Sequence, residues 1–179
     1  MTRCALLAGL AVGAFATLAG AAEPTPLAEK MAGVYKHAFD NELVTGEKFK
    51  SENVLEIVPY KTGAAYFRIH SEFYNGHMCD ISGIAVATTD RLVFNGPNDD
   101  SGAPCTLTIH PASDGVHIYE TETMACKNET CGERGGYGYR PDASPDFKLT
   151  DRKPIRYLPR LLASTEYADA VRNYTARAH

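Results

Sequence analysis

Hydrophobic and polar residues alternate with a period of two along much of the chain between residues 33 and 141. Ala65 and Phe67, for example, can face one side of a strand while Tyr66 and Arg68 face the other. This alternation predicts strands with one packed face and one solvated face. Segments that are also rich in Val, Ile, Thr, Tyr and Phe are 33–39, 53–60, 64–73, 78–87, 91–95, 105–110, 116–121 and 135–140. We therefore predict eight short strands.

Turn residues separate several of these segments, as at 61–63, 75–76 and 113–115. Asn75-Gly76 is the strongest hairpin signal among them. No helical crossover pattern lies between the predicted strands, which indicates antiparallel pairing. We expect a mainly all-β fold, an antiparallel eight-stranded up-and-down barrel, because closure removes exposed strand edges. A two-sheet sandwich is the alternative.

The periodicity changes after Pro141. Residues 142–154 are rich in turn formers, and Ser164 or Thr165 can cap a following helix. Apolar positions then recur at helical spacing, at Tyr167, Ala170, Val171 and Tyr174. Residues 142–179 are thus predicted to form a connector and one C-terminal amphipathic helix, which packs on the outside of the barrel or closes one of its ends.

The N-terminus has the layout of a secretory signal peptide. Arg3 precedes an apolar run at 5–18, and small residues follow at 19–22. The run is short for a membrane span, which needs about 20 apolar residues, although an uncleaved anchor is the alternative. We expect a signal peptide at 1–22, an N-terminal segment at 23–32 and a barrel domain at 33–141. The predicted location is periplasmic or secreted, without stable membrane insertion after cleavage.

Cleavage near Ala22 would leave four cysteines, at positions 79, 105, 126 and 131. An even number of cysteines in an exported chain is typical of disulfides. Three pairings are possible, and we expect the local bond Cys126–Cys131 together with Cys79–Cys105. Zinc sites usually contain two short-spaced ligand pairs, and this sequence has one. We therefore expect no metal.

Charge is unevenly distributed along the chain. Residues 23–147 contain ten Lys or Arg and nineteen Asp or Glu, whereas residues 148–179 contain seven and three. An acidic main body argues against nucleic acid as a partner, since nucleic acid requires a basic surface. The same body is compatible with a basic protein partner.

The sequence lacks the motifs of common enzyme classes. It has no Walker loop, dinucleotide fingerprint, HExxH or GxSxG, and paired cysteines would leave no thiolate nucleophile. His70 and His77 flank one turn and His110 and His117 another, so each pair could meet across a hairpin and bind a metal. The alternative is that these four histidines occupy exposed polar positions on the outer face of the barrel. The acidic loop 96–102 lacks a complete calcium pattern. We expect no enzyme, cofactor or metal.

Three carboxylates lie on predicted strands: Glu56, Glu72 and Asp80. Glycoside hydrolysis requires two opposed carboxylates, and the sequence does not bring any two of these together. We expect each of them on a solvated strand face.

A set of short motifs resembles a known family. The chain has a Gly-x-aromatic opening at 33–35, C-D-I-S-G at 79–83, C-x-L-x-I at 105–109 and a C-x4-C-G loop at 126–132, with an aromatic segment following. This order, over residues 33 to 140, resembles small exported bacterial proteins with a calycin-like barrel, including periplasmic inhibitors of lysozyme. The resemblance implies a barrel whose loops enter the active-site cleft of a muramidase.

Chicken-type and membrane-anchored members of that family use a Ser-Gly motif followed closely by tyrosine. Ser82-Gly83 supplies the pair here, and Ile84-Ala85 follows it. We expect an exported, non-enzymatic binding protein that inhibits a lysozyme-like peptidoglycan hydrolase, its partner being a basic muramidase or another cell-wall protein. Arg and Tyr are enriched at interface hot spots. The candidate contacts are Ser82, Gly83, Arg134, Tyr137 and Tyr139. The alternative is a carrier that holds a small apolar ligand inside the barrel.

Overall fold

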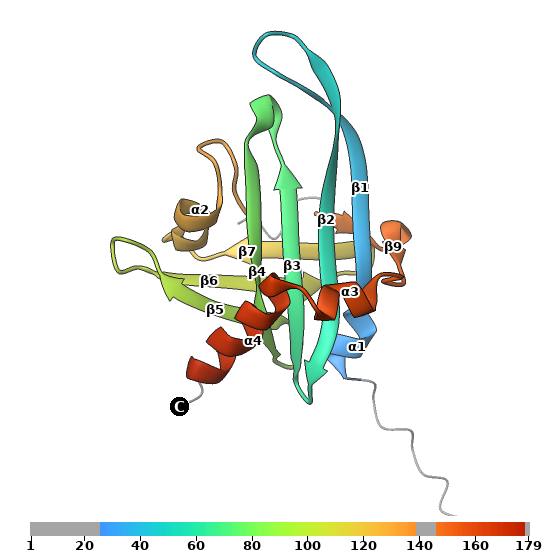
Figure 1. Ribbon diagram of the computed structural model, residues 1–179, viewed down its shortest axis with the longest axis vertical. Coiled ribbons are helices and arrows are strands. Elements are labelled where there is room, and N and C mark those ends of the chain that lie inside the picture. Colours follow the sequence, from blue (N-terminus) through green and yellow to red (C-terminus); the bar gives the residue numbers. More distant parts are fainter. Residues whose placement is uncertain (1–25, 139–145, 178–179) are drawn as a thin grey trace, which may run out of the picture.

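One antiparallel sheet of nine strands forms the framework of the described residues, 26–138 and 146–177, in this computed structural model (Figure 1). In chain order the elements are α1 Leu27–Met31, β1 Gly33–Glu42, β2 Lys48–Lys61, β3 Ala64–Glu72, the 3-10 turn η1 Tyr74–Gly76, β4 Met78–Ala87, β5 Leu92–Asn98, β6 Pro104–Pro111, β7 Gly115–Glu120, α2 Ala125–Thr130, β8 Phe147–Lys148, the 3-10 turn η2 Leu149–Asp151, β9 Arg152–Lys153, α3 Leu158–Leu162 and α4 Thr165–Arg177.

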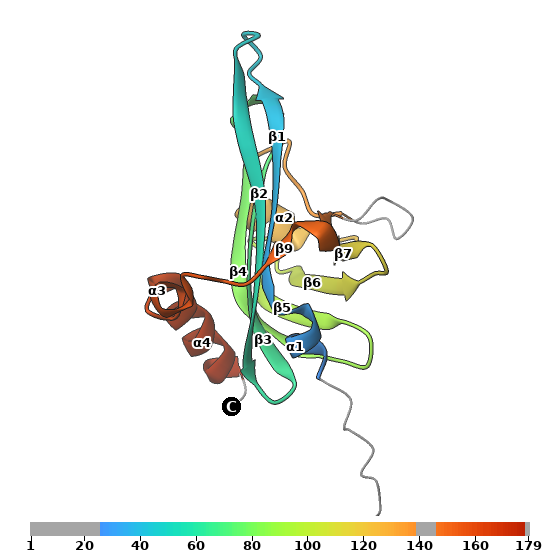
Figure 2. The same ribbon diagram turned by 90° about the vertical axis from the view of Figure 1, so that its right-hand side faces the viewer.

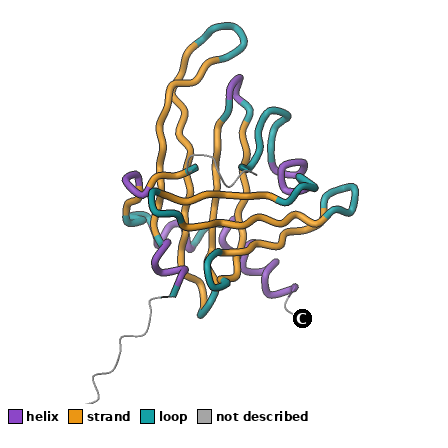
Figure 3. The backbone as a smooth tube through the Cα atoms, turned by 180° about the vertical axis from the view of Figure 1, so that it is seen from behind, coloured by secondary structure: helices purple, strands orange, loops and turns teal. Residues whose placement is uncertain are grey.

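The sheet curls into a nearly closed barrel. Its strand order is β8-β7-β6-β5-β4-β3-β2-β1-β9, and every neighbouring pair is antiparallel. The two outermost strands, β8 and β9, are joined by η2 alone, so the chain itself connects the two edges of the sheet. Strands β5–β7 run across the long strands β1–β4 (Figure 3). The predicted antiparallel barrel is confirmed, with nine strands instead of eight.

The last part of the barrel differs from the prediction. Residues 135–138, the described part of the predicted strand 135–140, form no strand. They contain three glycines, and Gly138 lies so close to β7 that a Cβ would stand 2.8 Å from the Ile118 carbonyl oxygen. Glycine-rich stretches pair poorly as strands. The β7 edge pairs with Phe147 and Lys148 instead, inside the segment predicted as a connector.

Large apolar side chains fill the interior of the barrel. Residues with essentially no exposed surface come from both long and short strands: Leu55, Ile57, Phe67, Ile69, Leu92, Leu107 and Ile109. Phe67 and Phe94 meet edge to face with ring centroids 5.1 Å apart. Burying each such side chain stabilises the fold by about 1.5–3 kcal/mol. The interior is therefore a packed core.

The C-terminal helices cover the outer face of β2–β4, on the side away from β5–β7 (Figure 2). Tyr66 and Ile84 point outward and form a second apolar cluster with Leu161 of α3 and Ala170 of α4. Ser164 caps α4, because its Oγ accepts the Tyr167 N–H at 3.2 Å. The predicted amphipathic helix and its cap are confirmed, and the helix packs on the outside of the barrel.

Candidate functional site

Two disulfides fix the region around α2, and their pairing corrects the predicted one. Cys79 bonds Cys131, and Cys105 bonds Cys126. The predicted bonds Cys126–Cys131 and Cys79–Cys105 are wrong because residues 125–130 form a helix. Cys126 lies in the first turn of this helix and Cys131 follows its end in extended backbone, so the two cysteines point toward different parts of the barrel.

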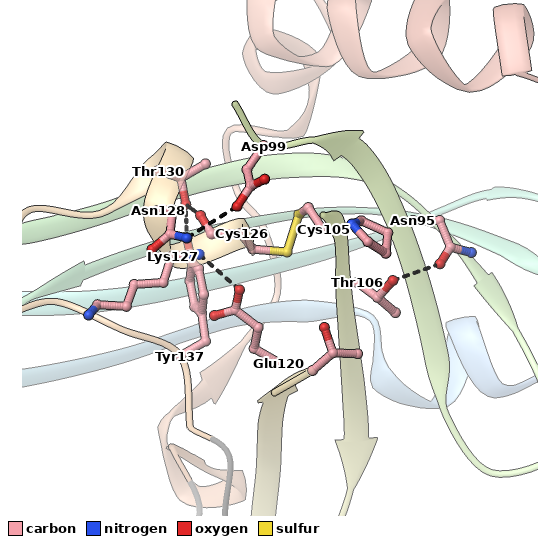
Figure 4. Close-up of a disulfide and its surroundings, with 12 residues drawn as sticks. Asn95, Asp99, Cys105, Thr106, Glu120, Cys126, Lys127, Asn128, Thr130 and Tyr137 are labelled. Atoms are coloured by element: carbon pink, nitrogen blue, oxygen red, sulfur yellow. Dashed lines mark hydrogen bonds between the residues drawn. A yellow bond between two sulfur atoms is a disulfide. The ribbon is translucent and has the colours of Figure 1, made fainter. Parts of the chain in front are cut away.

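These bonds hold two neighbouring segments against the barrel. The Cys105–Cys126 bond ties α2 to β6 (Figure 4). The Cys79–Cys131 bond, together with a backbone bridge between the same residues, ties the start of segment 131–138 to β4. Between the end of β7, α2 and this segment lies a cavity of about 510 Å³, which we call the α2 groove. Its lining residues are Glu120, Thr121, Glu122, Met124, Lys127, Gly135, Gly136 and Tyr137.

Two carboxylates, Glu120 and Glu122, and one cation, Lys127, line the α2 groove. Glu120 is only 9% exposed, and its Oε1 accepts the Lys127 backbone N–H at 2.9 Å. Burial raises the pKa of Glu120, although backbone hydrogen bonds from Lys127 and Cys126 oppose the shift. Glu122 is exposed at the rim. Since its two carboxylates outnumber the single lysine, the groove is suited to a cationic group.

Met124 stands at the lip of the groove in an uncommon conformation. Its backbone is left-handed, with φ 52° and ψ 26°, and its side chain is 42% exposed. A residue other than glycine, asparagine or aspartate rarely adopts this conformation, and such strain is enriched at functional sites. The exposed thioether gives the lip an adaptable apolar contact.

Of the predicted contacts, Arg134 and Tyr137 lie together on segment 131–138. Arg134 is exposed, whereas Tyr137 is partly buried against the core and its hydroxyl lies 2.7 Å from that of Thr130. Burial raises the pKa of Tyr137, so the phenol stays neutral at physiological pH. Tyr137 forms one wall of the groove (Figure 4). Tyr139 lies outside the described residues.

Ser82 and Gly83, the Ser-Gly pair of β4, do not line the α2 groove, and their side-chain positions face opposite sides of the sheet. Gly83 faces the interior, where a Cβ would stand 2.8 Å from Phe94 Cδ2 and closer still to Cε2. Gly83 is therefore a packing residue, and its role as a partner contact stays a prediction. Ser82 points to the outer face, and its register partner on β3 is Arg68.

The groove residues that sequence reasoning missed are Glu120, Glu122 and Met124. They become neighbours of Tyr137 only because α2 turns the chain back after β7 and the Cys105–Cys126 bond holds it there. The signal available in the sequence is the pair of acidic residues just before Cys126.

The predicted histidine pairs have different surroundings. His70 lies near Asp80, at 2.7 Å, and Glu72, at 3.3 Å. His110 and His117 are direct register partners on β6 and β7. The described part of the chain holds no group of three or more His, Cys, Asp or Glu arranged for a metal.

The acidic loop and one of the strand carboxylates also take defined roles. In loop 96–102, Asp99 Oδ1 accepts the backbone N–H groups of Ser101 and Ala103, both at 2.9 Å, and its Oδ2 accepts from Asn128 of α2 at 3.2 Å, so the loop is a turn tied to α2. Glu56 was expected on a solvated face, but it is 1% exposed beneath the segment that precedes α3. The prediction for Glu56 is wrong, because that segment covers it.

No protein-family model matches this chain, and searches of curated proteins and of solved structures find no match. Among the helices within residues 26–138 and 146–177, none is long and apolar enough to cross a membrane. The two disulfides indicate folding in an oxidising, exported environment. The predicted signal peptide, residues 1–22, lies outside the described residues.

Proposed function

We propose that this chain is an exported, non-enzymatic protein that binds a basic protein partner through the α2 groove. The carboxylate-lined groove, with disulfides anchoring the segments on both sides, is the observation that carries the proposal. The partner class that fits best is a lysozyme-like peptidoglycan hydrolase, met in the periplasm or outside the cell. Insertion of the groove rim into the cleft of the enzyme would block substrate entry.

Charge and rigidity both support this function. Residues 23–147 carry a net charge of −9, which attracts a basic protein over long range and accelerates association. The walls of the groove are covalently anchored, so little conformational freedom is lost when a partner docks. Glu120 and Glu122 would receive a Lys or Arg of the partner, and Met124 and Tyr137 would contact apolar surface beside it.

The packed interior argues against the alternative, a small apolar ligand carried inside the barrel. The positions that would line such a ligand site are occupied by one another's side chains, as with Phe67 and Phe94. An eight- or nine-stranded barrel has room for filling side chains or for one small ligand, and here the side chains take the space.

The test combines binding and inhibition. The purified protein is titrated into a panel of basic lysozymes by calorimetry, and protection of cell walls is followed by turbidity. Glu122→Lys and Met124→Asn should each weaken binding about tenfold or more, because one reverses a rim charge and the other makes the apolar lip polar.

Glu47→Lys is the matched control. It makes the same charge change in the β1–β2 turn, away from the groove, and should leave affinity nearly unchanged. Absence of binding and protection at micromolar protein would refute the proposal. Equal losses of affinity in Glu122→Lys and Glu47→Lys would show that binding depends on the overall charge of the protein and not on the groove.

A further inference from the structure

A second cavity, of about 260 Å³, lies on the outer face of the barrel, where α3 and α4 meet β2 and β3. Six of its lining residues have charged or phenolic side chains: Glu56, Tyr66, Arg68, Tyr157, Arg160 and Glu166. In Figure 2 these two helices lie across β2–β4 from the layer that contains α2. The cavity is therefore separate from the α2 groove.

An ion pair between the buried Glu56 and the partly exposed Arg68 forms the floor of this cavity. Arg68 donates from Nε to Glu56 Oε2 at 2.7 Å and from Nη2 to Oε1 at 3.3 Å, and the Tyr157 hydroxyl also donates to Oε1. Two-point pairing of this kind neutralises the buried carboxylate and fixes its orientation. The floor is thus polar and rigid, and its net charge is zero.

The two tyrosines keep their protons at neutral pH and add fixed dipoles. Burial, together with the nearby Glu56 carboxylate, raises the pKa of Tyr66 to about 12. The pKa of Tyr157 is also raised, again by burial and by Glu56. Their hydroxyls therefore remain neutral hydrogen-bonding groups, and their rings form the side walls of the cavity.

The rim carries one cation and one anion that are not neutralised. Arg160 lies over the Tyr157 ring, with its guanidinium carbon 5.5 Å from the ring centroid, and Glu166 lies in the first turn of α4. Within the described ranges, neither Arg160 nor Glu166 forms an ion pair or a hydrogen bond through its side chain. Both side chains are exposed and line the same cavity without pairing with each other.

From this arrangement we propose that the cavity binds a small zwitterion, a free amino acid or a dipeptide. The carboxylate of the ligand pairs with Arg160, and its ammonium group pairs with Glu166. The neutral floor favours neither sign of charge. A ligand with a single charge would leave either Arg160 or Glu166 without a partner, so it would bind more weakly.

The size of the cavity supports the same ligand class. Its volume lies below the range of about 300–1,000 Å³ that is typical of sites for drug-sized molecules. It corresponds to roughly nine water molecules at about 30 Å³ each, which suits an amino acid or a dipeptide. This inference does not depend on the function proposed for the α2 groove.

The experiment is calorimetric titration of the oxidised full chain with four probes: alanine, alanylalanine, propionate and ethylamine. The last two each carry one half of the zwitterion. At least one zwitterion should bind about tenfold more tightly than propionate and ethylamine. Arg160→Gln and Glu166→Gln should each remove about tenfold of that affinity, and Arg160→Gln should leave the response to ethylamine unchanged.

Arg156→Gln is the matched control, because Arg156 is an exposed arginine on the same segment that does not line this cavity. It should bind the zwitterion like the wild type. Propionate binding as tightly as alanine or alanylalanine would reduce the site to a general anion contact and overturn the proposal. The absence of saturable binding at roughly millimolar probe would also overturn it. So would a loss of zwitterion affinity in Arg156→Gln equal to that in Arg160→Gln. All variants change exposed residues, and circular dichroism checks that they fold.

Discussion

Among single residues, Gly83 shows most directly how packing restricts the residue type at a position. An added Cβ would stand 2.8 Å from Phe94 Cδ2, so Gly83→Ala forces the ring out of its contact with Phe67. We expect a loss of about 1–3 kcal/mol in the free energy of unfolding, measured by urea denaturation. Gly136→Ala is the control, because its Cβ would meet only Lys127 Cδ at 3.7 Å. Similar losses in both variants would contradict this assignment.

The Ser82-Gly83 pair also marks a limit of sequence reasoning. The alternation along β4 shows that adjacent residues face opposite sides, but the sequence does not say which side meets the core. Phe94, which occupies the space beside Gly83, lies on the next strand and is brought there only by the folded sheet. The glycine was recognisable as a special position, whereas its reason was not.

His70 should make stability depend on pH. Burial of the ring opposes protonation, but hydrogen bonds to Asp80 and Glu72 outweigh it and raise the pKa of His70 above its usual 6.5. Protonation therefore favours the folded state, fully below about pH 6.5, and this contribution is lost as pH rises through the folded pKa. His70→Gln should lower the free energy of unfolding more at about pH 5.5 than at about pH 8.5. Urea denaturation at both values measures the difference.

His110 supplies a control of opposite sign. Burial, with Arg91 nearby, lowers the pKa of His110, so protonation at low pH disfavours the folded state. The free energy of unfolding of His110→Gln, relative to that of the wild type, should thus rise as pH falls, which is the reverse of the trend for His70→Gln. If both variants shift in the same direction with pH, the environment assigned to one of the two histidines is incorrect.

For whole elements, the docking of α4 depends on its apolar face. Ala170 is buried against the outer cluster of β2–β4, whereas Ala168 on the same helix is exposed. Ala170→Asp should lower the free energy of unfolding by at least about 2 kcal/mol, because it places a charge in an apolar contact. Binding of a hydrophobic dye should rise as α4 separates from the sheet. Ala168→Asp has a comparable cost in helix propensity and should show neither effect; equal behaviour would refute the assigned face.

Elements were predictable where their signal is local. β3 and β4 follow the predicted segments 64–73 and 78–87 almost to the residue, because alternation and the Asn75-Gly76 turn specify both. Helix α4 is similar, since its cap and its spacing lie within the helix itself. β8 and β9 were missed because two residues are too few to show a period. Those strands exist only because the edges of β7 and β1 offer partners.

At the scale of the whole molecule, the cysteine pairing was the main error, and it changed the interpretation of the site. A local Cys126–Cys131 bond would have closed a small loop. The observed bonds instead connect residues 52 and 21 positions apart, and the shorter loop lies inside the longer one. The barrel core was predictable from periodicity alone. The α2 groove was not, because α2, segment 131–138 and β7 meet only in three dimensions.

These two bonds should therefore stabilise the fold to different extents. In the chain-entropy description, closing loops of 21 and 52 residues is worth about 3 and about 4 kcal/mol. The double variant Cys105→Ala/Cys126→Ala should lose about 3 kcal/mol in urea denaturation, and Cys79→Ala/Cys131→Ala somewhat more. Alanine leaves no unpaired polar group in these buried positions. The wild type in reductant is the control and should lose more than either variant. If reduction leaves its denaturation midpoint unchanged, the bonds do not constrain the unfolded chain, and the rigidity invoked for the α2 groove has no covalent basis.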